Sequence, residues 1–300
     1  MSRIHEALKK AAQERAVAQP PDTAASPIDS GSLTAPAAAD VFTQTAVLPP
    51  PRSDYLRFNE LRTNCSQPRW HPNPDANVFL SAIPNAHGAE QFRTLRSRLY
   101  QLRGSQSLRT ILVTSSVAAE GKTFVANNLA QAIVRQPDRR VLIIDADLRR
   151  PRLHTVLGAP AAPGLTDYLS GAADEMTVIQ HGQEGNLCFI PGGSEVTNPS
   201  ELLANDRLKT LLDRLTPVFD WIIVDSPPCL PVADASVLAG LCDGVLLVVR
   251  AESTPTATAQ RACQELRERN VVGVVLNAVE DPPAYYGSSY YYGSDTKSEE

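Results

Sequence analysis

The chain has 300 residues, 43% of them hydrophobic, which is enough to bury the core of one large or two modest domains. Its formal net charge of −5 provides no general positive field, which argues against nucleic acid as a partner. The five cysteines form no CxxC pair, and no apolar run reaches the roughly 18 residues of a membrane span. We therefore expect a cytoplasmic protein with reduced thiols.

The N-terminal part of the chain shows little regular pattern. Residues 1–17 place Ile4 and Leu8 on a narrow apolar stripe, which predicts a weakly amphipathic helix that either docks on a partner or frays. Residues 18–53 are rich in Pro, Ala, Ser and Thr, and we expect a disordered linker there. Residues 54–88 form an extended lead-in, with room for one short helix before its prolines.

Beyond this lead-in, short runs of Val, Ile and Leu alternate with amphipathic stretches as far as about residue 279. The predicted strands are 109–114, 140–145, 187–190, 220–225, 243–249 and 271–277. The predicted helices are 89–102, 122–136, several short ones up to about 181, and then 200–215, 232–241 and 255–269. This alternation predicts an α/β domain over residues 89–279, with a mostly parallel sheet and helices on both faces.

The loop after the first of these strands has the parts of a phosphate cradle: Ile111-Leu-Val-Thr-Ser-Ser-Val-Ala-Ala-Glu-Gly-Lys-Thr123. In such a loop backbone N–H groups surround the β-phosphate, Lys122 reaches the β- and γ-oxygens, and Thr123 ligates Mg²⁺. The strict motif has Gly where this chain has Ser116, and Ala119 adds a Cβ where such loops often use Gly. The alternative interpretation is an ordinary helix N-terminus.

Carboxylates follow two other strands. Asp145 and Asp147 leave the strand at 140–145, and Asp225 ends the strand Trp221-Ile-Ile-Val-Asp225. Parallel strands end at one edge of the sheet, where open α/β sheets bind ligands. Acids beside a phosphate cradle suit metal binding and acceptance of a proton from an attacking hydroxyl. An isolated Asp after a strand is more often a turn or a helix cap.

These motifs together resemble the bacterial tyrosine kinases, cytoplasmic autokinases of capsular and exopolysaccharide systems, from about Glu90 to the C-terminus. Ser115-Ser-Val-Ala-Ala-Glu-Gly-Lys-Thr123 is similar to that family's Walker A loop, Leu142-Ile-Ile-Asp-Ala-Asp-Leu-Arg-Arg-Pro-Arg152 to its Walker A′ motif, and Ile222-Ile-Val-Asp-Ser-Pro-Pro228 to its Walker B motif. The departure is Ala118-Ala119, where the family commonly has Pro-Gly.

The resemblance implies a P-loop NTPase-type fold that binds ATP and Mg²⁺. The catalytic residues that it implies are Lys122, Asp145 and Asp147, although the sequence does not indicate which aspartate is the base. The implied contacts to the nucleotide are Ser116, Glu120, Gly121, Lys122, Thr123, Phe124 and Asp225. The implied metal ligands are Thr123, Asp147 and Asp225.

The motif Glu90-Gln-Phe-Arg-Thr-Leu-Arg96 mediates assembly into a ring, an octamer, in the family that this chain resembles. Helical spacing places Glu90, Arg93 and Arg96 along one side, free to pair with acids of a neighbouring subunit. The alternative is a solvated charged face.

Related partition and septum-placing ATPases carry an additional lysine early in the phosphate loop, and this chain has none there.

The segment 280–300 is predicted to be a disordered, acidic tail with a charge of −4, and it holds five of the eight tyrosines. The resemblance implies that these are the autophosphorylation sites: Tyr285, Tyr286, Tyr290, Tyr291 and Tyr292. The alternative is a low-complexity tail of Tyr, Gly and Ser without such a role.

The resemblance also implies partners: a membrane chain-length-determinant protein that activates the kinase and recruits it to the inner face of the plasma membrane, and a phosphotyrosine phosphatase. The implied function is tyrosine autophosphorylation that regulates polysaccharide polymerisation and export. Two alternatives stay open, a nucleotide-binding scaffold with little catalysis and an ATPase that acts on cargo other than tyrosine.

Overall fold

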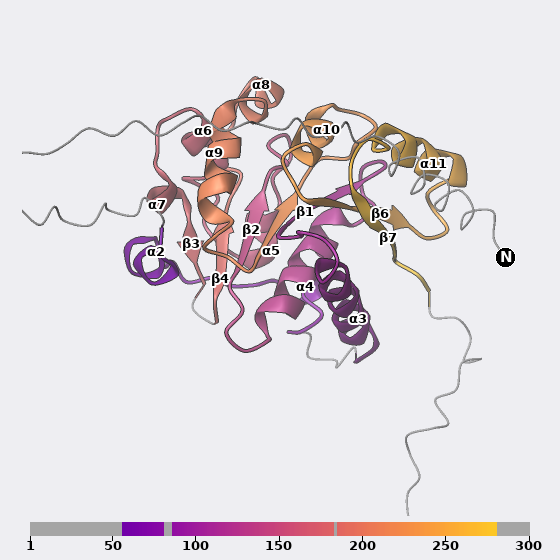
Figure 1. The fold of residues 1–300 in the computed structure, drawn as a ribbon, viewed down its shortest axis with the longest axis horizontal. Coiled ribbons are helices and arrows are strands. Elements are labelled where there is room, and N and C mark those ends of the chain that lie inside the picture. Colours follow the sequence, from indigo (N-terminus) through magenta and orange to yellow (C-terminus); the bar gives the residue numbers. More distant parts are fainter. Residues whose placement is uncertain (1–55, 81–85, 183–184, 281–300) are drawn as a thin grey trace, which may run out of the picture. The chain divides into compact units, whose positions relative to one another are not determined.

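The computed structural model describes residues 56–80, 86–182 and 185–280. The predicted N-terminal helix, the linker over 18–53 and the five tail tyrosines lie outside the described residues. The described chain has the predicted α/β architecture, with helices on both faces of a single seven-stranded sheet (Figure 1).

The sheet has the strand order β3-β4-β2-β5-β1-β6-β7. Its strands are β1 (Thr110–Ser115), β2 (Val141–Asp145), β3 (Gln180–His181), β4 (Leu187–Ile190), β5 (Trp221–Asp225), β6 (Gly244–Arg250) and β7 (Val271–Asn277). All neighbours pair in parallel except β3 and β4. Strands β1, β2 and β5 are buried along their whole length, which explains their continuous Val, Ile and Leu runs.

Two layers of helices cover the sheet. One layer comprises α3 (Ala86–Arg103), α4 (Lys122–Val134) and α5 (Leu153–Leu157). The other comprises α2 (Phe58–Asn64), α6 (Leu165–Leu169), α7 (Glu175–Val178), α8 (Pro199–Leu203), α9 (Asp206–Leu215), α10 (Asp234–Ala239) and α11 (Thr256–Glu265). Successive residues of β1, β2, β4, β5 and β6 alternate between the two cores, as the pleat requires.

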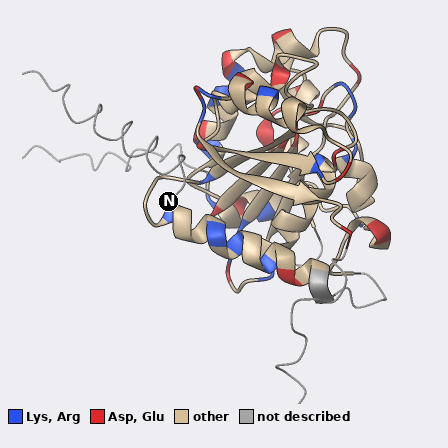
Figure 2. Cartoon of the chain, turned by 90° about the vertical axis from the view of Figure 1, so that its right-hand side faces the viewer, with Lys and Arg blue, Asp and Glu red and all other residues tan. Residues whose placement is uncertain are grey.

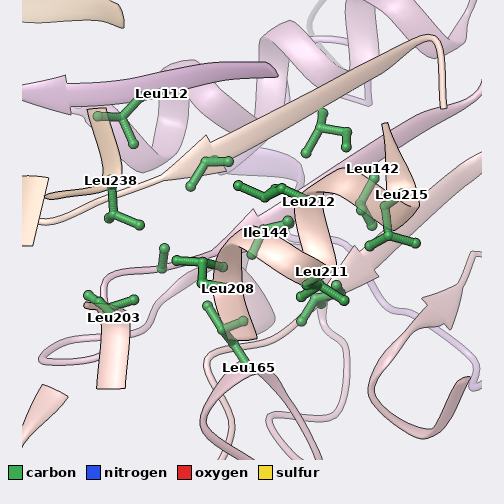
Figure 3. Packing of buried hydrophobic residues seen from close by; sticks show 14 of the residues in the cluster. Leu112, Leu142, Ile144, Leu165, Leu203, Leu208, Leu211, Leu212, Leu215 and Leu238 are labelled. Carbon is green, nitrogen blue, oxygen red and sulfur yellow. The ribbon is translucent and has the colours of Figure 1, made fainter. Parts of the chain in front are cut away.

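Helix α9 illustrates how the sequence pattern builds this core. Its four buried leucines, Leu208, Leu211, Leu212 and Leu215, recur at the i, i+3, i+4, i+7 spacing of one helix face. Figure 3 shows them in one cluster with Leu142 and Ile144 of β2. Burying each such side chain contributes about 1.5–3 kcal/mol, so this face fixes the helix on the sheet.

The lead-in before α3 is held to the domain by hydrogen bonds. The Asn128 side chain accepts from the Val78 N–H at 2.9 Å, and the side-chain amides of Asn127 and Asn128 both donate to the Ala76 carbonyl at 3.1 Å. The lead-in carries α2 and one 3₁₀ turn, η1 (Pro74–Ala76), with extended chain between them. Two buried asparagines of α4 therefore position a segment about fifty residues away in sequence.

Strand β3 is not among the predicted elements, because residues up to about 181 were expected to form short helices only. It has two residues, pairs antiparallel with β4, and also bridges to Ser66 of the lead-in. A strand this short has no alternation that a sequence can reveal. The sheet is therefore mostly, not wholly, parallel.

Candidate active site

The carboxyl ends of β1, β2 and β5 meet at one edge of the sheet. Asp145 and Asp225 are direct partners in the register of β2 and β5, and Asp225 is also opposite Val113 of β1. The loop that joins β1 to α4 starts beside them. The topology thus brings together three segments that are far apart in the sequence.

This loop has the backbone of an anion cradle. Gly121 has φ 93° and precedes α4, whose first turn has no side-chain cap. Uncapped N–H groups at a helix N-terminus bind anions, phosphate in particular. Ala119 has φ 67°, so the conformation suspected from the sequence is present and an alanine occupies it. That conformation costs an L-residue about 1 kcal/mol.

Lys122 is the first residue of α4 and points at the acids. Its Nζ lies 3.0 Å from Oδ2 of Asp147, and the two side chains are only 16% and 6% exposed. Burial lowers the pKa of Lys122, but the charges of Asp225 and Asp147 outweigh it and raise the pKa above its ordinary value. Lys122 is therefore a fixed positive charge inside a pocket of carboxylates.

Asp145 is fully buried, and one of its two carboxylate oxygens has a structural role. Its Oδ2 accepts the N–H groups of Arg152 and Leu153, both at 2.9 Å, where α5 begins. Its Oδ1 has no hydrogen-bond partner among the described residues. Burial, together with the neighbouring charge of Asp225, raises the pKa of Asp145 well above its ordinary value.

Asp225 is also fully buried, and neither of its oxygens makes a hydrogen bond of normal geometry within the described chain. Burial raises the pKa of Asp225 to about 7, against the opposing effects of Lys122 and the Thr123 hydroxyl. The Ser116 hydroxyl is buried and unpaired as well. Unsatisfied buried polar groups are costly, so this set of oxygens indicates a site built to bind a polar ligand.

The residues fit Mg²⁺ that arrives with a nucleotide. Within the described residues no three His, Cys, Asp or Glu side chains are arranged to hold a metal on their own. Mg²⁺ is commonly held by one or two carboxylates together with phosphate oxygens and water. The free oxygens of Asp225 and the hydroxyl of Thr123, at the head of α4, suit that arrangement.

Glu120 stabilises the phosphate loop through hydrogen bonds of its side chain and its backbone carbonyl. It is 2% exposed, its Oε2 accepts the Val117 N–H at 2.8 Å, and its Oε1 accepts from the Thr254 hydroxyl. Its backbone carbonyl accepts from the Asn277 side-chain amide at 2.9 Å. Both carboxylate oxygens are thus already engaged within the protein, and no pattern in the sequence indicates Thr254 or Asn277 as partners of Glu120.

The side chain of Asn277 lies against Gly121 and leaves no space for a side chain at that position. A Cβ at Gly121 would lie 2.0 Å from the Asn277 Nδ2, so the loop tolerates only glycine there. Phe124, the third residue of α4, is half-buried and packs edge-on against Phe92 at 5.9 Å between ring centroids. These contacts fix the loop between α3 and the end of β7.

A second network fixes the segment that carries Asp147. Arg149 donates from Nε to Oδ2 of the fully buried Asp234 at 2.8 Å, and from Nη2 to the Ser200 hydroxyl at 2.8 Å. Ser200 in turn donates to Oδ1 of Asp234 at 2.6 Å. The sequence singled out neither residue, although Arg149 lies within the stretch that is similar to the Walker A′ motif.

Helix α3 is lined with basic residues (Figure 2). Arg93 pairs with Glu90 of the same helix at 3.0 Å, and both side chains are exposed. Arg96 instead donates from Nη1 to the Ala132 carbonyl at 2.7 Å, close to the end of α4. Of the three predicted interface residues, Glu90 and Arg93 are thus exposed to solvent, whereas Arg96 is partly buried and connects α3 to α4.

Comparison with known proteins decides the family. Residues 108–268 match the AAA domain family. The tyrosine-protein kinase YwqD of Bacillus subtilis is 32% identical over 221 residues, which are 73% of this chain and 92% of YwqD. This chain belongs to the bacterial tyrosine-protein kinase family. The putative tyrosine-protein kinase EpsB of Ralstonia solanacearum is 37% identical over 218 residues, 71% of this chain but only 29% of EpsB.

Solved structures agree with this assignment. The kinase domain of the Escherichia coli tyrosine kinase ETK has a TM-score of 0.62 and 35% identity, covering 69% of this chain and 80% of that domain. The VpsO kinase domain has a TM-score of 0.60 and 28% identity, covering 67% of this chain and all of that domain. The family and the P-loop fold expected from the motifs are therefore confirmed. None of the described helices is long and apolar enough to span a membrane.

Proposed function

We propose that this bacterial tyrosine kinase transfers the γ-phosphoryl group of ATP to the tyrosines of its own C-terminal cluster, mainly on a neighbouring copy in a ring. One observation carries the proposal. The Asn277 amide is hydrogen-bonded to the phosphate loop at Glu120, and Asn277 is the last residue of β7. The tail that holds the tyrosines therefore begins beside Lys122 and the three aspartates.

The proposed roles follow from the geometry. The uncapped N–H groups of α4 and Lys122 bind the phosphates, and Thr123 and Asp225 hold Mg²⁺, which neutralises charge on the phosphates when bound. Asp147 is the better candidate to accept the tyrosine proton, because its Oδ2 lies 3.0 Å from the phosphate-binding Lys122, whereas Asp145 is fully buried and holds the start of α5. Asp145 then supports the site electrostatically.

Reach allows transfer to the chain's own site or to that of a neighbour. The fifteen residues from Asn277 to Tyr292 span about 50 Å when stretched and about 20 Å on average as flexible coil. The family's ring favours the neighbour, with Glu90 and Arg93 of α3 in the contact. A separate membrane protein of the chain-length-determinant class is the proposed activator, a phosphotyrosine phosphatase the antagonist, and polysaccharide polymerisation and export the regulated process.

The decisive experiment mixes two variants with ATP and Mg²⁺, in the presence of the cytoplasmic segment of the membrane partner. Lys122→Met retains the tail but lacks the phosphate-binding lysine, and a chain truncated after residue 280 retains the site but lacks the tyrosines. We expect phosphotyrosine on the Lys122→Met chain only in the mixture, detected by antibody and mapped by mass spectrometry. Asp147→Ala in the truncated chain should abolish it.

Unlabelled wild-type protein under these conditions would refute the kinase proposal. One observation favours a second candidate, a nucleotide-binding scaffold: Ala119 occupies a left-handed conformation in the phosphate loop, which is unfavourable for alanine. ATP binding without any phosphotyrosine would select that candidate. ATP hydrolysis that persists after all five tail tyrosines are changed to Phe, without phosphotyrosine elsewhere, would select an ATPase with other cargo.

A further inference from the structure

An apolar groove lies between α11 and the last two strands. Its floor is formed by Leu247 and Val249 of β6 and by Val274 of β7, and one side of α11 forms its wall. The groove has a volume of about 580 Å³. That is the size of a site for one or two aromatic side chains rather than a packing defect.

The strand beside this groove presents apolar side chains to solvent. Val274 and Leu276 of β7 are 56% and 59% exposed, and Val279, two residues beyond the end of β7, is 54% exposed. Only two other large hydrophobic residues of the described chain are comparably exposed. β7 is also the last strand of the sheet, paired on one side with β6 alone among the described strands. A concentration of apolar surface on an edge strand marks an interaction site.

The wall of the groove has no charge. The α11 residues that line it are Thr256, Ala259, Gln260, Cys263 and Gln264. An apolar floor with neutral hydrogen-bonding groups along one wall suits an aromatic ring that carries a hydroxyl. The same surroundings disfavour a phosphate, because the described lining offers no cation to compensate for its lost hydration.

We propose that the unphosphorylated tail of this same chain folds back and docks its tyrosines in the α11–β7 groove. The tail leaves the described structure directly after Val279 and Glu280. Val274 lies about 10 Å back along β7 from its last residue, Asn277, and the nine residues from Asn277 to Tyr286 reach about 30 Å. So short a tether gives an effective concentration in the millimolar range, so even weak contacts suffice.

Docking and phosphoryl transfer then compete for the same side chains. A tyrosine in the groove is withheld from any kinase site, and a phosphorylated tyrosine carries a charge of about −1.5 to −2 that the groove does not accept. Glu280 and Asp281 already make the start of the tail acidic. Phosphorylation would therefore release the tail from the groove. This release rests on the proposed kinase function, whereas the docking itself does not.

Cys263 provides a reporter for the test. It lines the groove and is the exposed one of the five cysteines; Cys65, Cys188 and Cys229 are buried and Cys242 is half-buried. The Lys122→Met background prevents autophosphorylation by the proposed mechanism. In it we expect alkylation of Cys263 by a bulky maleimide, followed by peptide mass spectrometry, to be at least threefold slower in the full-length chain than after removal of residues 281–300.

Matched variants separate docking from other effects. Changing the five tail tyrosines to Ser or to Glu should speed labelling as the truncation does, whereas changing Ser288 and Ser289 to Ala should not. Val274→Ser, a change at a half-exposed floor residue, should abolish the difference between full-length and truncated chains. Equal rates in the full-length and truncated chains would overturn the proposal.

Two other results would also overturn it. Acceleration on removal of residues 1–55 but not of the tail would assign the groove to the N-terminal segment, and protection that disappears on dilution would assign it to a second copy. The outcome is independent of catalysis. Slow labelling of Cys263 in the Lys122→Met chain, with no phosphotyrosine in wild type, would support the docking and reject the kinase function. Fast labelling of Cys263 with phosphotyrosine in wild type would reject the docking and support the kinase function.

Discussion

Ala119 stands in the phosphate loop at a position where similar loops often use glycine. At φ 67° it has a left-handed backbone that glycine adopts freely and alanine does not. We predict that Ala119→Gly raises the free energy of unfolding by up to about 1 kcal/mol. Urea denaturation measures it. Ala118→Gly is the control, because Ala118 has no positive φ and should lose stability instead. An equal response of the two variants would contradict the strain.

Asp225 makes the stability of the nucleotide-free protein depend on pH. Burial raises its pKa from 3.8 to about 7. Between these values the folded chain retains a proton that the unfolded chain has released, so the free energy of unfolding falls as the pH rises from about 4 to about 7. Burial raises the pKa of Asp145 as well, so it acts in the same direction.

Asp225→Asn should therefore stabilise the nucleotide-free protein at pH 8, by as much as about 4 kcal/mol, and change it little at pH 4. Urea denaturation at the two pH values measures both effects. Asp213→Asn, an exposed change on α9, is the control and should stay within about 0.5 kcal/mol. If the variant is less stable than wild type at pH 8, the Asp225 carboxylate does not destabilise the folded protein.

Among the elements, the segment after β2 depends on the network of Arg149, Ser200 and Asp234. Arg149→Ala leaves the fully buried Asp234 with Ser200 as its remaining side-chain partner and should cost about 1–3 kcal/mol. Arg150→Ala, next in the chain and exposed, should cost less than about 0.5 kcal/mol. A double-mutant cycle with Asp234→Ala, measured in urea, should show coupling of at least about 1 kcal/mol. Simple additivity of the two changes would contradict the network.

Elements with a long periodic signal were predictable, and so was the place where their ends meet. The apolar runs of β1, β2 and β5, with Asp145 and Asp225 at their ends, define a parallel sheet whose edge gathers those residues. Glu120 shows the limit of this reasoning. Its partners Thr254 and Asn277 are 134 and 157 residues away. Single contacts over such separations have no periodicity, and β3 is too short to have any.

At the scale of the whole molecule, the kinase site and its proposed substrate share one end of one strand. β7 contacts the phosphate loop through Asn277, borders the α11 groove through Val274, and leads into the tail. In the proposed scheme, the groove and the kinase site compete for the tail. The proposed ring would raise the local concentration of neighbouring sites and would shift this competition toward phosphoryl transfer.

Arg93 tests whether assembly controls the reaction. It is exposed on α3 and its described partner is Glu90 of the same helix, so Arg93→Glu should leave the fold and ATP binding intact. We predict loss of the oligomer in sedimentation and at least a tenfold fall in tail phosphorylation at equal concentration. Arg98→Glu carries the same charge change on another side of α3 and should retain both. If Arg93→Glu still assembles, Arg93 is not part of the contact between copies. If it phosphorylates its tail at the wild-type rate as a monomer, transfer between neighbours is not the route, and the tail reaches its own site directly.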